Sequence, residues 1–195
     1  PPEQLFSLHR KTEGWPAALR LAAIAIGRGE GSESFIEHFS GSDRALADYL
    51  ADDVLERQPD AVRGFLLRTS VLRYLSGPLC DALVPKVDSD ATLQALESAD
   101  IPLTRVERDE RWYRYHSLFA DFLRDRLARE FPQEVPRMHA AASTWYETNG
   151  RFVPAIDHAL EGGEHARAVA LLSRHAEDLL GQGRMRLLSR WFDAL

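Results

Sequence analysis

The sequence predicts a mainly α-helical fold, in which a winged-helix-like domain with one β-hairpin is followed by antiparallel helical hairpins of the tetratricopeptide kind. Three observations lead to this prediction. Apolar residues recur three and four positions apart along most of the 195 residues, which is the spacing of amphipathic helices. The period changes to two over residues 101–115, where a charged turn separates two strand-like stretches. After residue 133, glycines separate short helical segments, as in stacked helical hairpins.

The N-terminal part contains three predicted helices. The first spans Pro16–Ile26, because a proline at the first helical position loses no hydrogen bond, and it ends at the glycines of residues 27–31. Ser34 and Glu37 resemble a capping box and predict a short helix over residues 35–39. A longer helix is predicted after Ser42, with an apolar stripe made of Leu46, Tyr49, Leu50, Val54 and Leu55.

The middle of the chain has the element order of a winged helix. Pro59 is the predicted first residue of a helix that runs to about Ser70. Gly77 opens a second helix, and Asp88 begins the cap of a third. On the second helix Leu79, Ala82 and Leu83 are predicted to face inward, and on the third Leu93, Leu96 and Ala99 lie on one face. Strands at residues 101–106 and 112–115 then form the hairpin, which completes the outline of a winged helix.

The C-terminal part is predicted to be helical throughout. One helix starts at Leu118 and ends near Pro132, and later helices are closed by Gly150, Gly162 and Gly181. We therefore divide the chain into a helical arm (1–41), a winged-helix-like domain (42–132) and the start of a helical repeat domain (133–195). Because two helix pairs are few for a solenoid, and because the first residue is not methionine, we expect a piece of a longer protein.

Composition argues against several classes of function. The formal net charge is −6, so no overall basic field would attract nucleic acid. Cys80 is the one cysteine, which excludes an intramolecular disulfide and a cysteine-cluster metal site, and its apolar neighbours predict a buried thiol. No apolar stretch reaches the length of a membrane span, and no signal-peptide pattern occurs. We therefore expect a cytoplasmic protein without membrane contact.

No enzyme activity is predicted for this chain by itself. A P-loop needs a lysine that follows a glycine, and neither Lys11 nor Lys86 has that neighbour. No serine lies in a nucleophile-elbow motif, so no catalytic residue is assigned.

No metal ligand is predicted either. His158, Glu161 and His165 would share a helix face, but Gly162 and Gly163 interrupt the helix between them. We therefore interpret these histidines as solvated surface residues.

Two interpretations are open for the hairpin. Trp112–Tyr115 alternates aromatic residues with arginine, and Arg105, Arg108 and Arg111 lie nearby, which is a pattern typical of nucleic-acid platforms. Acidic residues in the same region nearly balance these charges. We therefore favour a hairpin that packs on its own helices and on a neighbouring domain.

His116 lies where the second strand meets the next helix. A helix N-terminus offers unpaired N–H groups and a partial positive charge, so an anion such as a phosphate can bind there, and a histidine would add a donor. The alternative is a histidine that merely caps the helix. Ser117 could also serve as the cap.

Four stretches of the chain carry a family resemblance. They are residues 12–23, 49–55, 65–72 and 111–119. In order and spacing they resemble the MalT-like, large ATP-binding regulators of the LuxR type. The resemblance covers nearly the whole chain, and its last stretch, which contains Tyr115-His116-Ser117, is the most specific.

The resemblance implies a role for the chain within a signal-transduction ATPase. In such proteins an N-terminal P-loop domain is followed by a helical arm, a winged helix, repeats that sense a small-molecule inducer, and a C-terminal helix-turn-helix that binds promoter DNA. ADP keeps them inactive, whereas ATP and inducer favour self-association and transcription activation. This chain would be the non-catalytic coupling fragment, with its own nucleotide-binding and sensor domains as partners and no cofactor of its own.

The resemblance also implies nucleotide-contacting residues. Gly14-Trp15-Pro16 is similar to the G-x-P motif of related ATPases, whose proline packs near the adenine. His116 resembles the histidine of the Met-His-Asp motif, which contacts the β-phosphate of ADP. Tyr115 replaces the methionine of that motif, and Ser117 replaces the aspartate.

Two rival functions remain. A winged-helix nucleic-acid-binding module would show salt-dependent binding to duplex DNA. A helical scaffold for a protein or small ligand would show a ligand-dependent thermal shift.

Overall fold

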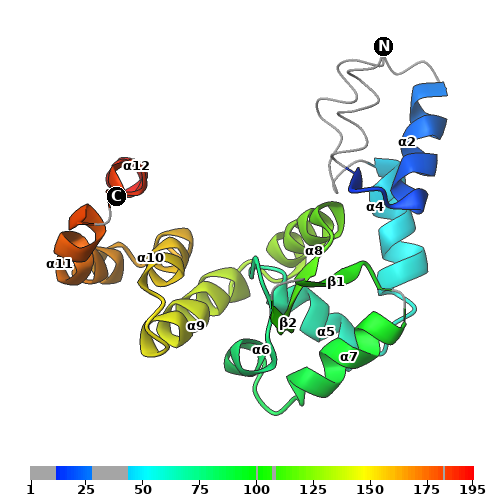
Figure 1. Ribbon diagram of the computed structural model, residues 1–195. Helices are drawn as coiled ribbons and strands as arrows, with labels where there is room; N and C mark the ends of the chain where they lie inside the picture. Colours follow the sequence, from blue (N-terminus) through cyan, green and yellow to red (C-terminus); the bar gives the residue numbers. More distant parts are fainter. Residues whose placement is uncertain (1–11, 28–43, 100, 107–108, 182) are drawn as a thin grey trace.

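The computed structural model describes residues 12–27, 44–99, 101–106, 109–181 and 183–195 (Figure 1). The chain is mainly helical with one antiparallel hairpin, which confirms the predicted fold class. Its elements are α2 (Pro16–Gly27), α4 (Arg44–Tyr49), the π-helix η1 (Leu50–Leu55), α5 (Asp60–Thr69), α6 (Gly77–Leu83), α7 (Ser89–Ser98), β1 (Leu103–Val106), β2 (Asp109–Tyr115), α8 (Ser117–Glu130), α9 (Glu134–Thr148), α10 (Phe152–Glu161), α11 (His165–Gly181) and α12 (Met185–Ala194).

Figure 1 shows these elements in three groups along the molecule. Helices α2 and α4 lie at one end, α5 to α8 surround the hairpin in the middle, and α9 to α12 lead away to the other end. Within the ranges that the structure describes, no helix is both long and apolar enough to cross a membrane. The domain limits at residues 41 and 132 stay a prediction.

Backbone and side-chain hydrogen bonds hold the hairpin against the segments that pack on it. Leu103 pairs with Tyr115 in the ladder, and Leu75 adds an isolated bridge to Tyr113, with both N···O distances 2.8 Å. The Tyr115 hydroxyl lies 2.7 Å from Thr69 Oγ1, which itself donates to the Phe65 carbonyl. The strand that leads into His116 is therefore fixed both through its backbone and through a buried side-chain contact.

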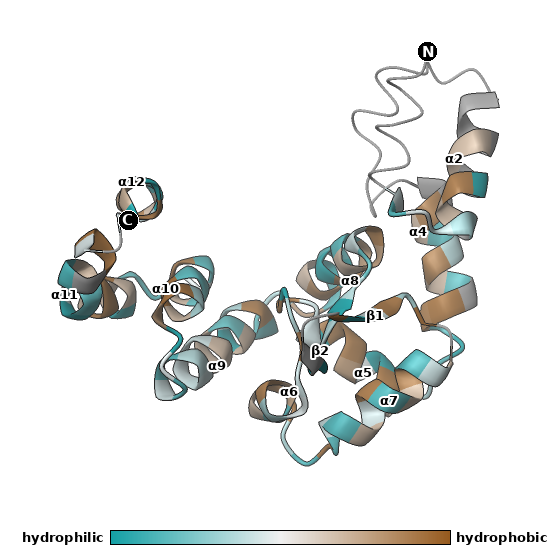
Figure 2. Cartoon of the chain, viewed as in Figure 1, coloured by the Kyte–Doolittle hydropathy of each residue, from teal (hydrophilic) through white to brown (hydrophobic). Residues whose placement is uncertain are grey.

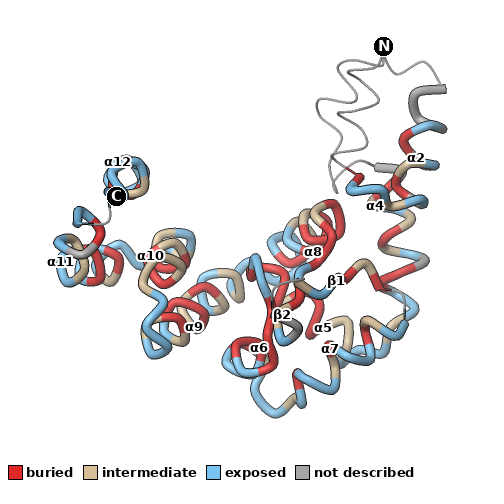
Figure 3. The backbone as a smooth tube through the Cα atoms, in the orientation of Figure 1, coloured by how far each residue is buried: buried red, intermediate tan, exposed pale blue. Residues whose placement is uncertain are grey.

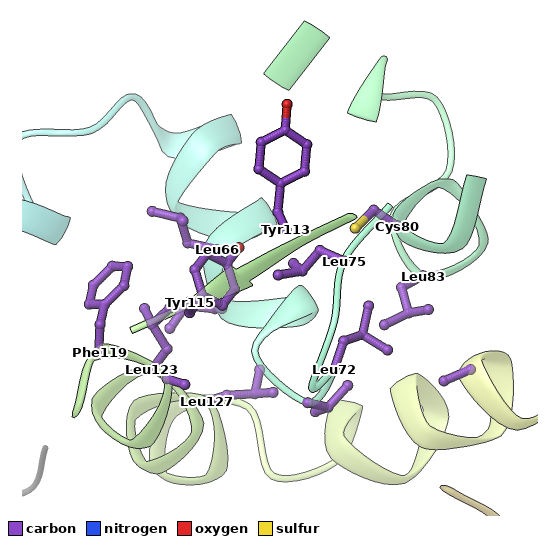
Figure 4. Packing of buried hydrophobic residues seen from close by; sticks show 14 of the residues in the cluster. Leu66, Leu72, Leu75, Cys80, Leu83, Tyr113, Tyr115, Phe119, Leu123 and Leu127 are labelled. Carbon is purple, nitrogen blue, oxygen red and sulfur yellow. The ribbon is translucent and has the colours of Figure 1, made fainter. Parts of the chain in front are cut away.

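The winged-helix core fills the space between the hairpin and helices α5, α6 and α8. Figure 4 shows side chains from all of these elements converging there. Cys80 is fully buried among them, as predicted, and burial raises the pKa of its thiol. In Figures 2 and 3 the hydrophobic residues gather on the buried faces of the helices, as amphipathic helices require.

Several local predictions need correction. Pro59 is the N-cap of α5 rather than its first residue, since its ψ of 148° is not helical. Ala82 is exposed rather than inward-facing, because α6 buries a narrower stripe that includes Leu79, Cys80 and Leu83. Ala99 is the exposed C-cap of α7 and lies outside the face that Leu93 and Leu96 bury. The helix predicted over residues 35–39 and the Ser42 cap lie outside the described residues.

The long helix predicted after Ser42 changes its hydrogen-bonding pattern halfway. It continues from α4 into η1, which ends with the Glu56 N–H on the Ala51 carbonyl at 2.8 Å, a five-residue step. Leu50 and Leu55, also five residues apart, are both fully buried. The wider turn therefore keeps both leucines on the inner face, where an ordinary α-helix would rotate one of them away.

The winged helix continues directly into the first repeat helix. Arg68 on α5 forms a bidentate ion pair with Glu134 at the start of α9, with Nε 2.6 Å from Oε2 and Nη2 3.0 Å from Oε1. Trp112 of the hairpin meets Trp145 of α9 edge to face, with ring centroids 6.4 Å apart. Gly150 and Gly163 have φ of 69° and 74° and end α9 and α10, a conformation that favours glycine.

Candidate functional site

The candidate site is the place where the turn before α2 meets the start of α8. The Trp15 N–H donates to the Thr12 carbonyl at 2.7 Å, which closes a tight turn. Its two central residues, Glu13 and Gly14, have φ of 46° and 77°. Turns with two such residues strongly prefer glycine at one of them, which explains Gly14. We call Thr12–Trp15 together with Arg114, His116 and Ser117 the arm junction.

His116 links the two halves of the arm junction through both ring nitrogens. As the N-cap of α8, its Nδ1 accepts from the Leu118 N–H at 3.3 Å. Its Nε2 lies 2.6 Å from the Thr12 carbonyl, so the ring proton is on Nε2 and is donated to that oxygen. His116 therefore caps α8, which was the alternative interpretation, while Ser117 is the first residue of the helix and not its cap.

Trp15 covers the histidine from the arm side. Its ring centroid lies 5.2 Å from that of His116 and 6.2 Å from that of Tyr49 on α4. The indole of the arm thus lies between Tyr49 of α4 and His116 at the start of α8. His116 itself is buried.

Glu13 supplies a negative charge at the N-terminus of α8. Its Oε2 lies 2.7 Å from Arg114 Nη2 of the hairpin. Burial acts to raise the pKa of Glu13, but hydrogen bonds from Ser117 and the charge of Arg114 outweigh it and lower the pKa. A carboxylate therefore occupies the position at which a helix N-terminus favours an anion.

This arrangement predicts a pH dependence. Because the pKa of Glu13 is lower in the folded chain than in the unfolded chain, its contribution to stability is complete above the unfolded value of about 4.3. It is lost as the pH falls through the lowered folded value. Urea unfolding at a series of pH values should show wild type more stable than Glu13→Gln near pH 7, with the difference shrinking below pH ~4. A Glu177→Gln control at an exposed position should show no such trend, and a constant difference for Glu13→Gln would contradict the assignment.

The three predicted nucleotide-contacting residues lie in or beside the arm junction. Gly14 is exposed in the turn, Pro16 is exposed at the first position of α2, and His116 is buried against Trp15. Their roles toward a nucleotide stay a prediction. Sequence reasoning missed Glu13 and Arg114, since a contact across 101 residues leaves no signal in one sequence.

A second polar cluster lies between α9 and α10. His139 Nδ1 and His158 Nδ1 are 2.9 Å apart, and Glu161 Oε2 lies 3.4 Å from the first and 4.0 Å from the second. Burial lowers the pKa of each histidine to about 4, with a smaller contribution from Arg124 at His139 and from His139 at His158. The surface position predicted for His158 is wrong, because α9 covers this face of α10. His165 is exposed, as predicted.

An open groove of about 790 Å³ separates the winged helix from α10 and α12. Its walls carry charges of both signs, among them Arg114, Arg124, Asp157, Glu161 and Arg190. All three of these arginines form ion pairs: Arg114 with Glu13, Arg124 with Asp121 and Arg190 with Asp157.

The hairpin packs on its neighbours. Trp112 contacts Trp145 and lies under the Arg151 guanidinium at 4.9 Å. Arg105 pairs with Glu97 of α7 at 2.8 Å, and Arg114 pairs with Glu13 of the arm. These three side chains of the hairpin therefore all contact other residues of the same chain.

Comparisons with known proteins agree with this architecture. Residues 51–135 match the MalT winged helix domain family. Over 182 residues, 93% of the chain, it is 37% identical to the serine/threonine-protein kinase PknK of Mycobacterium tuberculosis. Over 187 residues, 95% of the chain, it is 33% identical to the HTH-type transcriptional regulator MalT of Yersinia pestis. The chain spans only 16% of the length of the kinase and 21% of that of the regulator.

Proposed function

Residues 51–135 form a winged helix domain of the MalT family within a MalT-like chain, and from this premise we propose that the chain couples nucleotide state to regulatory output. In this proposal it acts in a longer regulator, next to a nucleotide-binding domain on one side and a sensor domain on the other. The chain itself catalyses nothing and holds no cofactor of its own. ATP or ADP binds to the neighbouring domain, and promoter DNA binds to a separate helix-turn-helix.

The observation that carries the proposal is the docking of the arm on the start of α8. Thr12, Glu13 and Trp15 all contact residues 114–117, so the arm and the winged helix share one small contact surface. A displacement of the arm away from the start of α8 would break the His116–Thr12 hydrogen bond and the Arg114–Glu13 ion pair. Such a contact can report on an event in the domain that precedes the arm.

The start of α8 has the donors that a phosphate oxygen requires. In this structure His116 donates its Nε2–H to the Thr12 carbonyl. The Arg114 guanidinium and Ser117 both donate to the Glu13 carboxylate. Glu13 in particular provides a negative group in the anion-favouring position of the helix. We propose that these same donors turn toward a phosphate of ADP bound by the preceding domain, and that the arm shifts when they do.

The second contact surface transmits the movement onward. Arg68–Glu134 and Trp112–Trp145 join the winged helix to α9, so the winged helix and the first repeat helix are joined by charge and by packing. Similar segments occur in proteins named as kinases and in proteins named as transcriptional regulators. We therefore expect the coupling to be independent of the kind of output domain.

Direct nucleic-acid binding by the hairpin is the less favoured function. Stacking on bases needs exposed aromatic faces. Trp112 instead packs between Trp145 and Arg151, and Tyr113 and Tyr115 are buried.

The proposal is tested by ADP affinity. In a protein that also carries the preceding nucleotide-binding domain, His116→Ala removes a donor from the proposed phosphate contact. A lost hydrogen bond to a charged group amounts to ~1.5–3 kcal/mol, so ADP should bind roughly tenfold more weakly or worse, and basal activity should rise. Calorimetric titration of ADP and a reporter assay without inducer measure the two effects.

The matched control is His165→Ala, at an exposed histidine outside the junction. It should leave both ADP affinity and basal activity unchanged. Unchanged ADP affinity in His116→Ala would overturn the coupling role of the arm junction.

A further inference from the structure

The cluster of His139, His158 and Glu161 has no part in the proposed coupling. Its three ligand atoms, two imidazole Nδ1 and one carboxylate oxygen, all lie within 4.8 Å of one another. They come from two consecutive helices, α9 and α10, and two of the three residues are buried. We propose that His139, His158 and Glu161 bind one Zn²⁺ ion, which clamps α9 to α10.

The distances between the ligand atoms fit a tetrahedral ion. With bonds of about 2.0–2.1 Å, neighbouring ligand atoms of a tetrahedral zinc site lie ~3.3–3.4 Å apart. The three separations found here are 2.9, 3.4 and 4.0 Å, which bracket that value. Shifts of a few tenths of an ångström in the ring and carboxylate positions suffice to make them equal.

The donor set is one that zinc accepts. Two imidazole nitrogens and a carboxylate oxygen make a three-residue site, in which water or another ligand takes the fourth position. His158 and Glu161 also line the open groove, so a path for the ion and for water exists. Burial keeps both rings uncharged at neutral pH, and they share a 2.9 Å Nδ1···Nδ1 hydrogen bond. The ring that donates in this bond moves its proton to Nε2 when the ion binds, so that both Nδ1 lone pairs face the ion.

The surrounding residues place the ligands and balance the charge. A Cβ on Gly162 would lie 2.9 Å from the Cβ of His139, so glycine allows α9 to approach the end of α10. The Tyr146 ring stacks on His158 at 5.5 Å and 15°. Two arginines near Glu161 are paired with other carboxylates, Arg124 with Asp121 and Arg190 with Asp157, which reduces their repulsion of a cation.

The test uses the 195-residue chain after treatment with a chelator and removal of the chelator. Calorimetric titration with ZnCl₂ should give one ion per chain, and Co²⁺ should give the visible absorption of a tetrahedral site. Zinc at about a hundred times its dissociation constant should raise the melting temperature by roughly 5–10 °C.

Glu161→Gln is the decisive variant, because its side chain is 59% exposed and its loss leaves the core intact. It should weaken zinc binding about tenfold or more, and His139→Gln should abolish it. Glu164→Gln and His165→Gln, at exposed positions only a few residues away, are the matched controls and should bind as wild type does.

Three outcomes would overturn the proposal. They are no stoichiometric zinc binding by wild type, wild-type affinity in Glu161→Gln, and an equal loss in His165→Gln, which would indicate adventitious binding at the surface. Because this test does not involve ADP, it can fail while the coupling function stands.

Discussion

Phe119→Ala should lower the free energy of unfolding by about 3–5 kcal/mol, the range for truncating a buried aromatic side chain. Phe119 is fully buried on the first turn of α8. Its ring meets Tyr115 edge to face at 5.7 Å and stacks with Phe122 at 6.4 Å. The change therefore opens a cavity directly beneath the strand that leads into His116, and it loosens the hairpin and α8 together.

Urea unfolding followed by circular dichroism measures the loss. Phe192→Ala is the matched control, because Phe192 is 66% exposed and its truncation should change stability by less than about 1 kcal/mol. If both variants lost the same stability, the position of Phe119 in the core would be wrong.

Trp191→Ala should have a comparably large effect that is confined to the C-terminal helices. Trp191 is 1% exposed and donates its indole N–H to Asp157 of α10 at 2.7 Å. Of the elements that the structure describes, α12 packs mainly on α10 and α11. Losing the indole therefore frees α12 and leaves the winged-helix core unaffected, because that core shares few contacts with it.

Hydrogen exchange measured by mass spectrometry distinguishes loosening that is confined to α12 from loosening of the whole chain. In Trp191→Ala the amides of residues 185–194 should exchange at least about tenfold faster, whereas those of α8 should keep the wild-type rate. Trp191→Phe retains an aromatic ring without the donor and should lie between wild type and alanine. Uniform acceleration along the chain would show that α12 belongs to one cooperative unit with the core.

Local sequence patterns predicted most of the helices well. Proline and glycine positions gave the start of α2 and the turns after α9 and α10, because these residues act through their own backbone preferences. The change of period at residues 101–115 identified the hairpin for the same local reason. The step from α4 to the π-helix η1 could not be predicted, since it depends on burying Leu50 and Leu55 against distant helices.

The candidate site was predictable only in part. His116 stood out because it lies at a helix N-terminus, where unpaired N–H groups favour an anion and a histidine adds a donor. Its partner Thr12 lies 104 residues away, and that separation is set by the packing of the arm, which leaves no trace in the local pattern. His139 was missed for a similar reason, because its relation to His158 requires the crossing of α9 and α10.

The burial of Cys80 makes the protein convenient for distance measurements. Its thiol is enclosed in the winged-helix core, and the raised pKa keeps it in the unreactive protonated form. A cysteine introduced at an exposed position of α2 and another on α12 would therefore be labelled selectively, with the native thiol left in place. Paired spin labels at two such positions would report how far the arm and the last helix move apart when the neighbouring domain changes its nucleotide.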